Sequence, residues 1–479
     1  MIILDGQSLS LKQLKEIACH KTPIQIAPHC LDKIANIRLE IDLKASGSKA
    51  YYGINTGFGA LSETKISTED LEKLQRNLIL SHAVGVGEPL SEAETRALML
   101  LRLNTLAKGF SGVRPLILER LAALLNRNLL PQIPRKGSVG ASGDLAPLAH
   151  LAMFLMKDHE GVEAFELHAK EGLALINGTQ AMTAVGCLAQ LEAESLSDFA
   201  DQIGSLSLDV LLGSDAPMDN RIHEARPHPG QIQSAKRIKE LLGSSELNES
   251  HRYCRKVQDA YSLRCMPQVH GATRDVLQYT RSVLEREINS ATDNPLVFEN
   301  HDILSGGNFH GQPVAFALDF LGIATAELAN ISERRMEQML NPMLSSGLPA
   351  FLTPNPGLNS GMMMLQVTAA ALINENKVLS HPASTDSIPT SANREDHVSM
   401  GMTSANKART IVDNVCHVLA IELLCAAQAL DLRRPLKSSS ALEALHESFR
   451  QHVSFAEVDR AYGIDLAKSV QYLKAQVNA

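Results

Sequence analysis

The sequence lacks the excess of positive charge that marks proteins binding nucleic acid or anionic membranes. Its 479 residues include 45 lysines and arginines against 53 aspartates and glutamates, and the formal net charge at pH 7 is −8. Without a global basic field, long-range attraction to polyanions is excluded as the basis of function. A small anionic substrate held by local groups is still compatible with this composition.

The chain also lacks recognisable targeting and membrane-spanning signals. Its first residues, MIILDGQSLSLKQL, contain neither a basic n-region nor a continuous apolar h-region. We find no apolar run that looks long enough to cross a bilayer, which takes about 20 residues in a helix. The sequence therefore predicts a soluble, cytoplasmic protein.

Disulfide and metal-binding patterns are missing as well. The seven cysteines are scattered and include no Cys-x-x-Cys pair, so we expect buried, reduced thiols without a disulfide framework or a zinc site. In the segment RIHEARPHPGQ, His223 and His228 lack the His-x-x-x-His spacing of helical ligands, and no third ligand is evident. We therefore expect a structured loop there and no metal.

A helical pattern runs along most of the chain. Hydrophobic residues make up 44% of the sequence, which is enough for a large core. Capping boxes are expected at Ser67 and Ser91, and a short β segment over residues 162–169. The expected shorter helices cover about residues 11–19, 71–82, 91–109 and 115–128, and the longer ones about 180–213, 271–291, 309–341, 358–379 and 396–432.

The long helices predict how the chain is divided. They exceed the mean of about 11–12 residues, and helices of this length pack naturally as a bundle. No internal repeat, low-complexity tract or clear linker appears. We expect an N-terminal domain over residues 1–180, a central long-helix bundle over residues 181–435, and a short helical tail over residues 436–479.

The most informative stretch is KGSVGASGDLAPLAH at residues 136–150. Its glycines recur at every third position and permit a tight turn that other residues resist. Asp144 is a good N-cap and Pro147 falls in a first helical turn, so a helix should begin just after the turn. The plainest interpretation is therefore a turn followed by a capped helix.

Two rival interpretations of this loop fail on detail. A phosphate cradle would require Gly-Lys-Ser/Thr, which does not follow, and Asp144 would repel an anion at the helix start. A serine-hydrolase elbow would require Gly-x-Ser-x-Gly around Ser142, which is not present. Neither nucleotide binding nor hydrolysis by this serine is therefore predicted.

A further interpretation is chemical. If the turn presses the amide nitrogen of Gly143 onto the carbonyl carbon of Ala141, the backbone can close a five-membered ring and lose water. Loss of the Ser142 hydroxyl as a second water would leave an exocyclic methylidene, which is a strong electrophile. Glycine suits the attacking position because no side chain crowds the ring, and serine suits the central one because its β-oxygen can leave.

The string GSVGASGDLAPLAH resembles the signature of the histidine ammonia-lyase family, whose relatives include the phenylalanine and tyrosine ammonia-lyases. The resemblance implies that Ala141, Ser142 and Gly143 become methylidene-imidazolone (MIO). It implies a mainly α fold of the aspartase/fumarase-like kind, an elongated bundle of long helices with a small mixed α/β N-terminal region carrying the MIO loop. It also implies conversion of L-histidine to trans-urocanate and ammonia by a homotetramer with shared active sites.

Three further matches precede or follow this loop. Tyr52 lies in YGINTGFG, which alone would suit a surface loop, and the resemblance makes it a base or proton relay. His82 lies in SHAVGVG near a helix end, where it could simply complement the helix dipole; the resemblance places it on the substrate imidazole. Asn177 could be a cap, and the resemblance assigns it to the cofactor and the substrate amino group.

A cluster in VQDAYSLRC carries polar groups at a spacing of three. Gln258, Tyr261 and Arg264 would share a face on one helical turn. They could form an ordinary polar cluster between helices, although a guanidinium is a natural carboxylate anchor and a phenol a plausible acid or base. The resemblance places Gln258 near the MIO ring, Tyr261 in proton transfer and Arg264 on the substrate carboxylate.

Two later residues complete the predicted site. Phe309 could be plain core and Glu395 an ordinary first-turn carboxylate after a helix start at Asn393, but the resemblance places both beside the substrate ring. In the mechanism usually drawn for the family, the substrate amine adds to the methylidene and a tyrosinate removes the β-proton. Tyr52 and Tyr261 both remain candidates for this base, and an unperturbed phenol titrates near ~10, so its pKa must be lowered or its proton shared.

The chain departs from the family pattern in places that bear on selectivity. Gly311-Gln312 stands where Ala-Glu or Gly-Glu is usual, Arg394 stands where Gln is frequent, and Ala260 stands where Pro is usual. The segment from Met156 to Glu171 is also shorter than is typical of the family. A tyrosine or phenylalanine ammonia-lyase or an aminomutase would use the same cofactor, but His82 with Glu395 suits an imidazole better than a phenyl ring. An alternative that is not an enzyme is an inactive helical scaffold, in which Ala-Ser-Gly would stay uncyclised.

Overall fold

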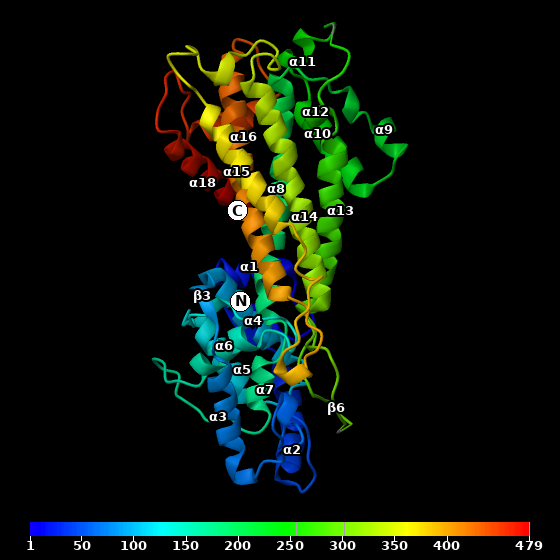
Figure 1. The fold of residues 1–479 in the computed structure, drawn as a ribbon, viewed down its shortest axis with the longest axis vertical. Helices are drawn as coiled ribbons and strands as arrows, with labels where there is room; N and C mark the ends of the chain where they lie inside the picture. Colours follow the sequence, from blue (N-terminus) through cyan, green and yellow to red (C-terminus); the bar gives the residue numbers. More distant parts are fainter. Residues whose placement is uncertain (255, 301, 479) are drawn as a thin grey trace. The chain divides into compact units, whose positions relative to one another are not determined.

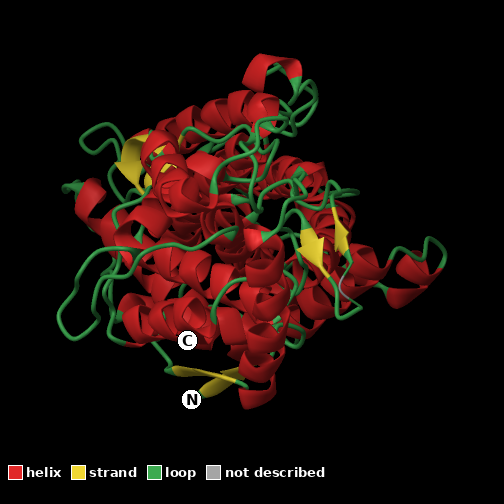
Figure 2. Ribbon diagram, turned by 90° about the horizontal axis from the view of Figure 1, so that it is seen from below, coloured by secondary structure: helices red, strands yellow, loops and turns green. Residues whose placement is uncertain are grey.

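The computed structural model describes residues 1–254, 256–300 and 302–478, and most of them lie in helices (Figures 1 and 2). The strands in these ranges form three two-stranded sheets, with β1 parallel to β2 and the pairs β3–β4 and β5–β6 antiparallel. The prediction of a mainly α protein with a small mixed α/β region is confirmed.

The chain forms two compact units, each assembled from three separate segments. Unit 1 comprises Met1–Ala189, Thr280–Asp319 and Pro382–Lys407, and unit 2 comprises Gln190–Tyr279, Phe320–His381 and Ala408–Ala479. The predicted division into three domains, with boundaries after residues 180 and 435, stays a prediction.

The described strands all belong to unit 1, together with the short helices of the N-terminal region. The strands are β1 (Ile2–Leu4), β2 (Ile24–Ile26), β3 (Val86–Pro89), β4 (Pro134–Lys136), β5 (Leu296–Val297) and β6 (Ile303–Leu304). The helices are α1 (Leu11–Ala18), α2 (Pro28–Ser46), α3 (Leu71–His82), α4 (Glu92–Ala107), α5 (Pro115–Asn126), α6 (Leu145–Leu155) and α7 (Glu171–Ile176).

Four long helices contribute residues to both units, and the remaining helices belong to unit 2. The long ones are α8 (Gln180–Val210), α13 (Met266–Glu287), α14 (Gln312–Leu340) and α16 (Gly401–Leu432). Those of unit 2 are α9 (Asn220–Glu224), α10 (Pro229–Leu242), α11 (Glu246–Ser250), α12 (Tyr261–Arg264), α15 (Met363–Leu379), α17 (Ser440–Arg450) and α18 (Tyr462–Asn478).

Buried charges join the long helices within unit 2. Arg335 on α14 and Glu422 on α16 form an ion pair, with Nη2 and Oε2 2.8 Å apart, and neither side chain is exposed. Ser207 on α8 donates to the same carboxylate at 2.6 Å, and Asp201 on α8 contacts His270 on α13 at 2.8 Å. Because an unpaired buried charge is costly, these contacts favour one register of the four helices over others.

The expectation that no apolar segment is long enough to cross a membrane was wrong, because two helices reach that length. Helices α14 and α16 are long and apolar enough by composition, but 67% and 83% of their apolar windows are buried within the protein. Helices in the core of a folded protein meet the same test. The buried pair of Arg335 and Glu422 lies on these two helices.

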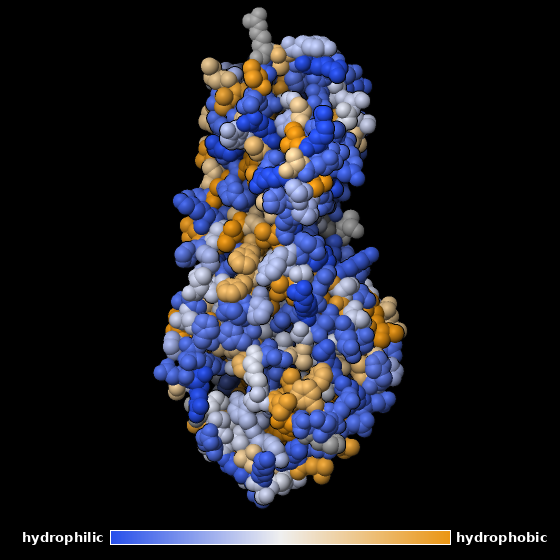
Figure 3. All heavy atoms as spheres, turned by 90° about the vertical axis from the view of Figure 1, so that its right-hand side faces the viewer, coloured by the Kyte–Doolittle hydropathy of each residue, from blue (hydrophilic) through white to orange (hydrophobic). Residues whose placement is uncertain are grey.

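Some hydrophobic side chains remain on the surface. Figure 3 shows them as patches among hydrophilic residues. On α15 the side chains of Met364, Val367 and Val378 are 63%, 51% and 70% exposed. Their spacing places them along one side of the helix, so α15 presents an apolar stripe that this single chain leaves uncovered.

Several local predictions need correction. Residues 162–169 form no strand, and only Val162 makes an isolated bridge, to His159. The helix expected from Asp396 begins at Gly401, because Met400 immediately before it has a left-handed φ of 55°. The loop expected over RIHEARPHPGQ was wrong in part, because His223 lies in the short helix α9 and Pro229 begins α10. The His223 ring nitrogens lie 3.0 Å from the Pro217 carbonyl oxygen and 3.0 Å from Gln231 Nε2.

The two predicted capping boxes turn out differently, and this difference can be tested. Ser91 accepts from the Glu94 amide at 3.3 Å, while Glu94 accepts from the Ser91 amide at 2.8 Å. Ser67 caps no amide and instead donates to Asp70 at 2.9 Å.

We expect Ser91→Ala to lower the free energy of unfolding by about 1 kcal/mol, and Ser67→Ala by less than about 0.5 kcal/mol, as measured by urea unfolding. Equal losses would contradict the assignment of the cap to Ser91.

Candidate active site

The loop around Ser142 is held by two distant segments of unit 1. The carbonyl of Val139 accepts from the Met400 amide at 2.8 Å. The carbonyl of Gly140 accepts from the Ser399 hydroxyl at 2.9 Å and from the Gly311 amide at 3.2 Å. These bonds fix the backbone of Val139 and Gly140, the two residues just before Ala141.

Gly143 is pressed against a second glycine. It has a φ of 69°, and a Cβ added there would overlap the carbonyl of Gly178. The Asp144 amide donates to that same carbonyl at 2.7 Å. A left-handed, tightly enclosed position of this kind admits only glycine without strain. The backbone of Gly143 is therefore closely confined by Gly178.

Asp144 occupies the N-cap position of α6, which begins at Leu145 as predicted, but its side chain does not cap that helix. The carboxylate accepts from the Ser138 hydroxyl at 2.6 Å and from the Met182 amide at 2.8 Å, at the start of α8. Burial raises the pKa of Asp144 to about 6, although the hydrogen bonds from Ser138 and Met182 oppose this shift. Asp144 therefore links the loop to α8.

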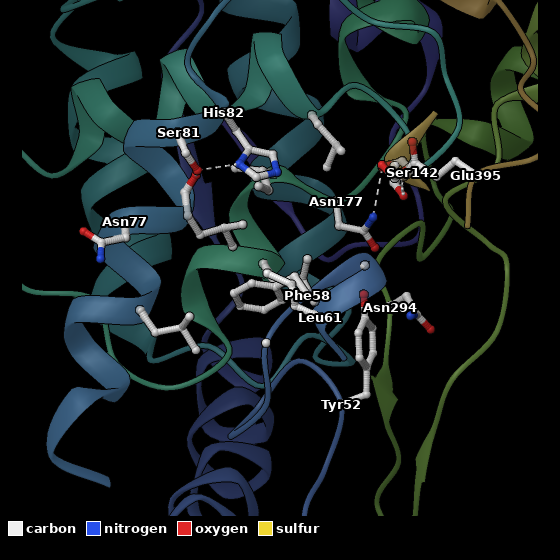
Figure 4. Close-up of a pocket in the computed structure, with 18 of the residues that line it drawn as sticks. Tyr52, Phe58, Leu61, Asn77, Ser81, His82, Ser142, Asn177, Asn294 and Glu395 are labelled. Carbon is white, nitrogen blue, oxygen red and sulfur yellow. Dashed lines mark hydrogen bonds between the residues drawn. The ribbon is translucent and has the colours of Figure 1, made fainter. Parts of the chain in front are cut away.

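The Ser142 side chain and carbonyl are both engaged (Figure 4). Its hydroxyl donates to Glu395 Oε1 at 2.7 Å, and its carbonyl accepts from Asn177 Nδ2 at 2.9 Å. The other carboxylate oxygen of Glu395 accepts from the Thr390 hydroxyl at 2.7 Å. Thus two predicted site residues touch Ser142 directly, from segments far apart in the sequence.

Asn177 is itself held by a buried cation. Arg102 on α4 donates through Nη1 to the Asn177 carbonyl at 3.0 Å and to Gln180 at 2.5 Å, and through Nη2 to Ala174. Burial lowers the pKa of Arg102 to about 10, against the pull of Asp293, so the guanidinium stays charged at neutral pH. The Asn177 Oδ1 atom is buried and has no partner among the described residues.

Ser142, Asn177 and Glu395 line a cavity of about 630 Å³ within unit 1 and lie at one side of it in Figure 4. His82 and Tyr52 also line this cavity. Its volume suits a small organic molecule. The remaining lining is formed by Gly57, Phe58, Gly59, Leu61, Thr64, Ile66, Leu74, Asn77, Leu78, Ser81, Leu145, Leu173, Ile176, Asn294, Phe309 and Ser391.

Tyr52 reaches the cavity from a segment that is anchored in the core. Ile54 is fully buried in the hydrophobic cluster of unit 1, and Asn55 accepts from the Tyr51 amide at 2.8 Å. The alternative of an ordinary surface loop is therefore wrong. Burial raises the pKa of Tyr52, the Gly59 amide opposes the shift and Glu395 adds to it. The phenol consequently keeps its proton at neutral pH in this environment.

His82 is the last residue of α3, and its ring is oriented by its neighbour. Ser81 Oγ lies 3.0 Å from His82 Nδ1 (Figure 4). The hydroxyl of Ser81 also donates to the Leu78 carbonyl at 3.0 Å. Because its proton is used there, the hydroxyl accepts from Nδ1 and leaves Nε2 as the acceptor in a neutral ring.

Gln258, Tyr261 and Arg264 belong to unit 2 and do not share one helical turn. Helix α12 spans only Tyr261–Arg264, and Gln258 precedes it in a loop because Ala260 is extended, with a ψ of 152°. Gln258 and Arg264 line a smaller cavity of unit 2, of about 380 Å³. The Arg264 guanidinium lies 4.8 Å from the centre of the Tyr261 ring, which is 68% exposed.

Some residues of the site were not predicted from the sequence. Asn294, in the turn string TDNP, lines the cavity. Ser399 and Met400 clamp the loop and end a string that reads only as a turn. Arg102 had one available signal, a charged residue within the apolar run MLLRL of a helix. Such a residue is usually buried only when its hydrogen bonds are satisfied.

Comparison with known proteins gives a consistent result over the whole chain. A family model described as aromatic amino acid lyase matches residues 9–451. The histidine ammonia-lyase of Anaeromyxobacter dehalogenans (strain 2CP-C) is 54% identical over 492 residues, with 97% of each chain covered. The histidine ammonia-lyase structure from Trypanosoma cruzi is 42% identical, with a TM-score of 0.92 over 100% of this chain and 94% of that one.

A relative with another activity is also close in structure. The tyrosine aminomutase from Streptomyces globisporus is 38% identical, with a TM-score of 0.94 over 99% of this chain and 97% of that one. The fold is therefore shared across several activities, while the sequence identity differs between them. On the match to the family model and on these identities, the chain belongs to the aromatic amino acid lyase family.

Proposed function

We propose that this chain is a histidine ammonia-lyase, which converts L-histidine to trans-urocanate and ammonia. The observation that carries the proposal is the environment of Ser142, whose hydroxyl donates to Glu395 and whose carbonyl accepts from Asn177 beside a cavity lined by His82. The identity of 54% to a histidine ammonia-lyase, against 38% to a tyrosine aminomutase, supports histidine as the substrate.

We further propose that Ala141, Ser142 and Gly143 form MIO. The residues present fit such a group: Gly143 stands where no Cβ can be placed, and the buried Oδ1 of Asn177 lacks a partner within the described part of the chain. When formed, MIO supplies an electrophile that withdraws electrons from the substrate so that ammonia can leave. Asn177 and the clamped backbone at Gly140 would hold the ring in place.

The remaining residues are proposed to bind the substrate and move its proton. His82 and Glu395 would hydrogen-bond the imidazole, with Phe309 against its face. Tyr52 would relay a proton, since the raised pKa keeps its phenol protonated at rest. Tyr261 is the other candidate for the base. Arg264 would bind the substrate carboxylate as a planar, permanently charged donor, and Gln258 would lie near the ring.

A homotetramer with shared active sites is proposed for the assembly. Three of the proposed site residues, Gln258, Tyr261 and Arg264, belong to unit 2, whereas the Ser142 cavity is lined by unit 1 alone. The exposed apolar stripe on α15 offers a surface to bury. Light scattering on the purified protein tests the mass of the assembly. A cytoplasmic location is proposed with it, which the seven free cysteines support.

The substrate proposal is tested by comparing turnover of histidine, tyrosine and phenylalanine. We expect urocanate to accumulate from histidine, as followed by its ultraviolet absorbance, with the highest kcat/KM of the three. Formation of cinnamates or β-amino acids without urocanate would contradict the proposal in favour of a tyrosine or phenylalanine lyase or an aminomutase.

Replacement of His82 tests the recognition of the ring. We expect His82→Leu to lower kcat/KM for histidine by roughly 10- to 100-fold, because one buried hydrogen bond to the imidazole would be lost. Turnover of phenylalanine should not fall in parallel, since its ring offers no such partner. The matched control is Asn77→Leu, a polar-to-apolar change on the same helix and the same cavity wall. Equal losses for both substrates would argue against contact with the imidazole.

A further inference from the structure

We propose that Glu395 is the acid catalyst that removes the Ser142 hydroxyl during formation of the electrophile. This inference rests on the proposed function, because it concerns how the chain prepares its own active site. It gives Glu395 a role before any substrate is present.

The geometry places this carboxyl group on the atom that must leave. Glu395 Oε1 lies 2.7 Å from Ser142 Oγ. Among the described residues, no other side chain hydrogen-bonds this oxygen: Asn177 donates to the Ser142 carbonyl instead, and both oxygens of Asp144 are engaged by Ser138 and Met182. Glu395 is therefore the group positioned to exchange a proton with Oγ.

The surrounding turn holds the carboxyl group in that position. Ser391, Ala392 and Asn393 have φ values of 50°, 54° and 65°. Thr390 and Glu395 pair across this turn, with the Thr390 amide donating to the Glu395 carbonyl at 2.9 Å. The Thr390 hydroxyl donates to the second carboxylate oxygen at 2.7 Å. Left-handed conformations are unfavourable for residues other than glycine, and strain of this kind concentrates at functional sites.

The chemistry requires an acid at this place because hydroxide is a poor leaving group. Once the ring has closed, the Ser142 Cα–H bond and the Cβ–Oγ bond both break. The Cα–H electron pair becomes the new double bond between Cα and Cβ, and Oγ departs with the electron pair of the Cβ–Oγ bond. The Cα proton passes to the Glu395 carboxylate, which then delivers it to Oγ. Oγ leaves as water and the carboxylate is restored, so the step needs no other reactant.

The same arrangement explains how one carboxyl group serves twice. While Ser142 keeps its hydroxyl, Oε1 of Glu395 is occupied by it. Loss of that hydroxyl removes the partner and leaves Oε1 beside the cavity as a free hydrogen-bonding group. Glu395 can then face a substrate only in a chain whose electrophile is complete.

Intact mass spectrometry of newly synthesised protein tests the proposal. The wild-type chain should lose two waters and become about 36 Da lighter than its sequence mass. Glu395→Gln should close the ring but retain the second water, at about 18 Da below the sequence mass, with dehydration slowed roughly 100-fold or more, as is typical when a general acid is removed. Asp396→Asn is the matched control, an exposed neighbouring carboxylate, and should mature like the wild type.

Each outcome bears on a distinct statement. If Glu395→Gln loses both waters at the wild-type rate, or loses neither, the assignment of Glu395 to the second dehydration is wrong. If the wild type itself keeps its full sequence mass, the proposed cofactor is wrong. Should Glu395→Gln not fold, as judged by circular dichroism, Glu395→Asp replaces it: its shorter carboxylate should slow the second loss, and unchanged maturation would overturn the proposal.

Discussion

Replacing Ser142 by alanine should lower kcat for histidine by roughly 10³-fold or more while the protein still folds. The loss is large because alanine has no hydroxyl to eliminate, and an enzyme deprived of its covalent catalyst retains little rate beyond binding and orientation. The fold should survive because the side chain is only partly buried and makes one hydrogen bond, to Glu395. Urocanate absorbance measures the rate, and circular dichroism checks the fold.

Thr64→Val is a suitable control for this experiment. Thr64 lines the same cavity and also carries a hydroxyl, but it is not part of the tripeptide that would cyclise. We expect less than about a tenfold change in kcat from it, which is the range of a single neutral hydrogen bond. A Ser142→Ala enzyme that retained near-normal turnover would refute the role of the tripeptide.

Adding one methyl group at Gly143 should damage both stability and activity. The Cβ of Gly143→Ala would overlap the Gly178 carbonyl, and the residue would remain at a φ of 69°. The left-handed conformation costs roughly 1–2 kcal/mol and forced backbone shifts about 1–3 kcal/mol, so we expect a loss of about 2–5 kcal/mol in the free energy of unfolding. Turnover should fall about 100-fold or more, because displacement by about 1 Å has that effect in active sites.

The matched control is Gly306→Ala. A Cβ at Gly306 would meet no atom within 4 Å, and this glycine is not left-handed. We expect its free energy of unfolding to change by less than about 0.5 kcal/mol, as for an exposed position. Urea unfolding and intact mass, measured together, separate the two effects. A Gly143→Ala protein of full stability and normal turnover would show that the loop is not confined as described.

The long helices could be predicted from the sequence because their apolar pattern is a local property. The boundaries of these helices could not be predicted where a contact with a distant segment determines the residue at which a helix begins. Helix α16 begins at Gly401 and not at Asp396, since the turn at residues 391–393 brings Glu395 back to Thr390 and on to Ser142. Likewise, Asp144 looked like a cap because one of its two partners, the Met182 amide, lies 38 positions further along the chain.

Part of the cavity lining could be predicted from the sequence, but not how that lining is held in place. Tyr52, His82, Asn177 and Glu395 were identified through a resemblance of motifs, and they line one cavity with Ser142. The supports of these residues were not identified. Arg102 showed only as a charged residue within an apolar run, and both Arg102 and Ser399 act largely through backbone carbonyls, which have no sequence signature. The spacing of Gln258, Tyr261 and Arg264 was misleading, because the chain is extended between the first two.

The hydrogen bonds that hold the loop also bear on the timing of biosynthesis. The Gly140 carbonyl accepts a hydrogen bond from Ser399, which the ribosome adds 259 positions later. At about 5–20 residues per second, the nascent chain waits roughly 13–50 s before that partner is even made. If the proposed cyclisation of the tripeptide requires this clamp, it follows translation of Ser399, and a truncated product would carry an unmodified serine instead of the electrophile.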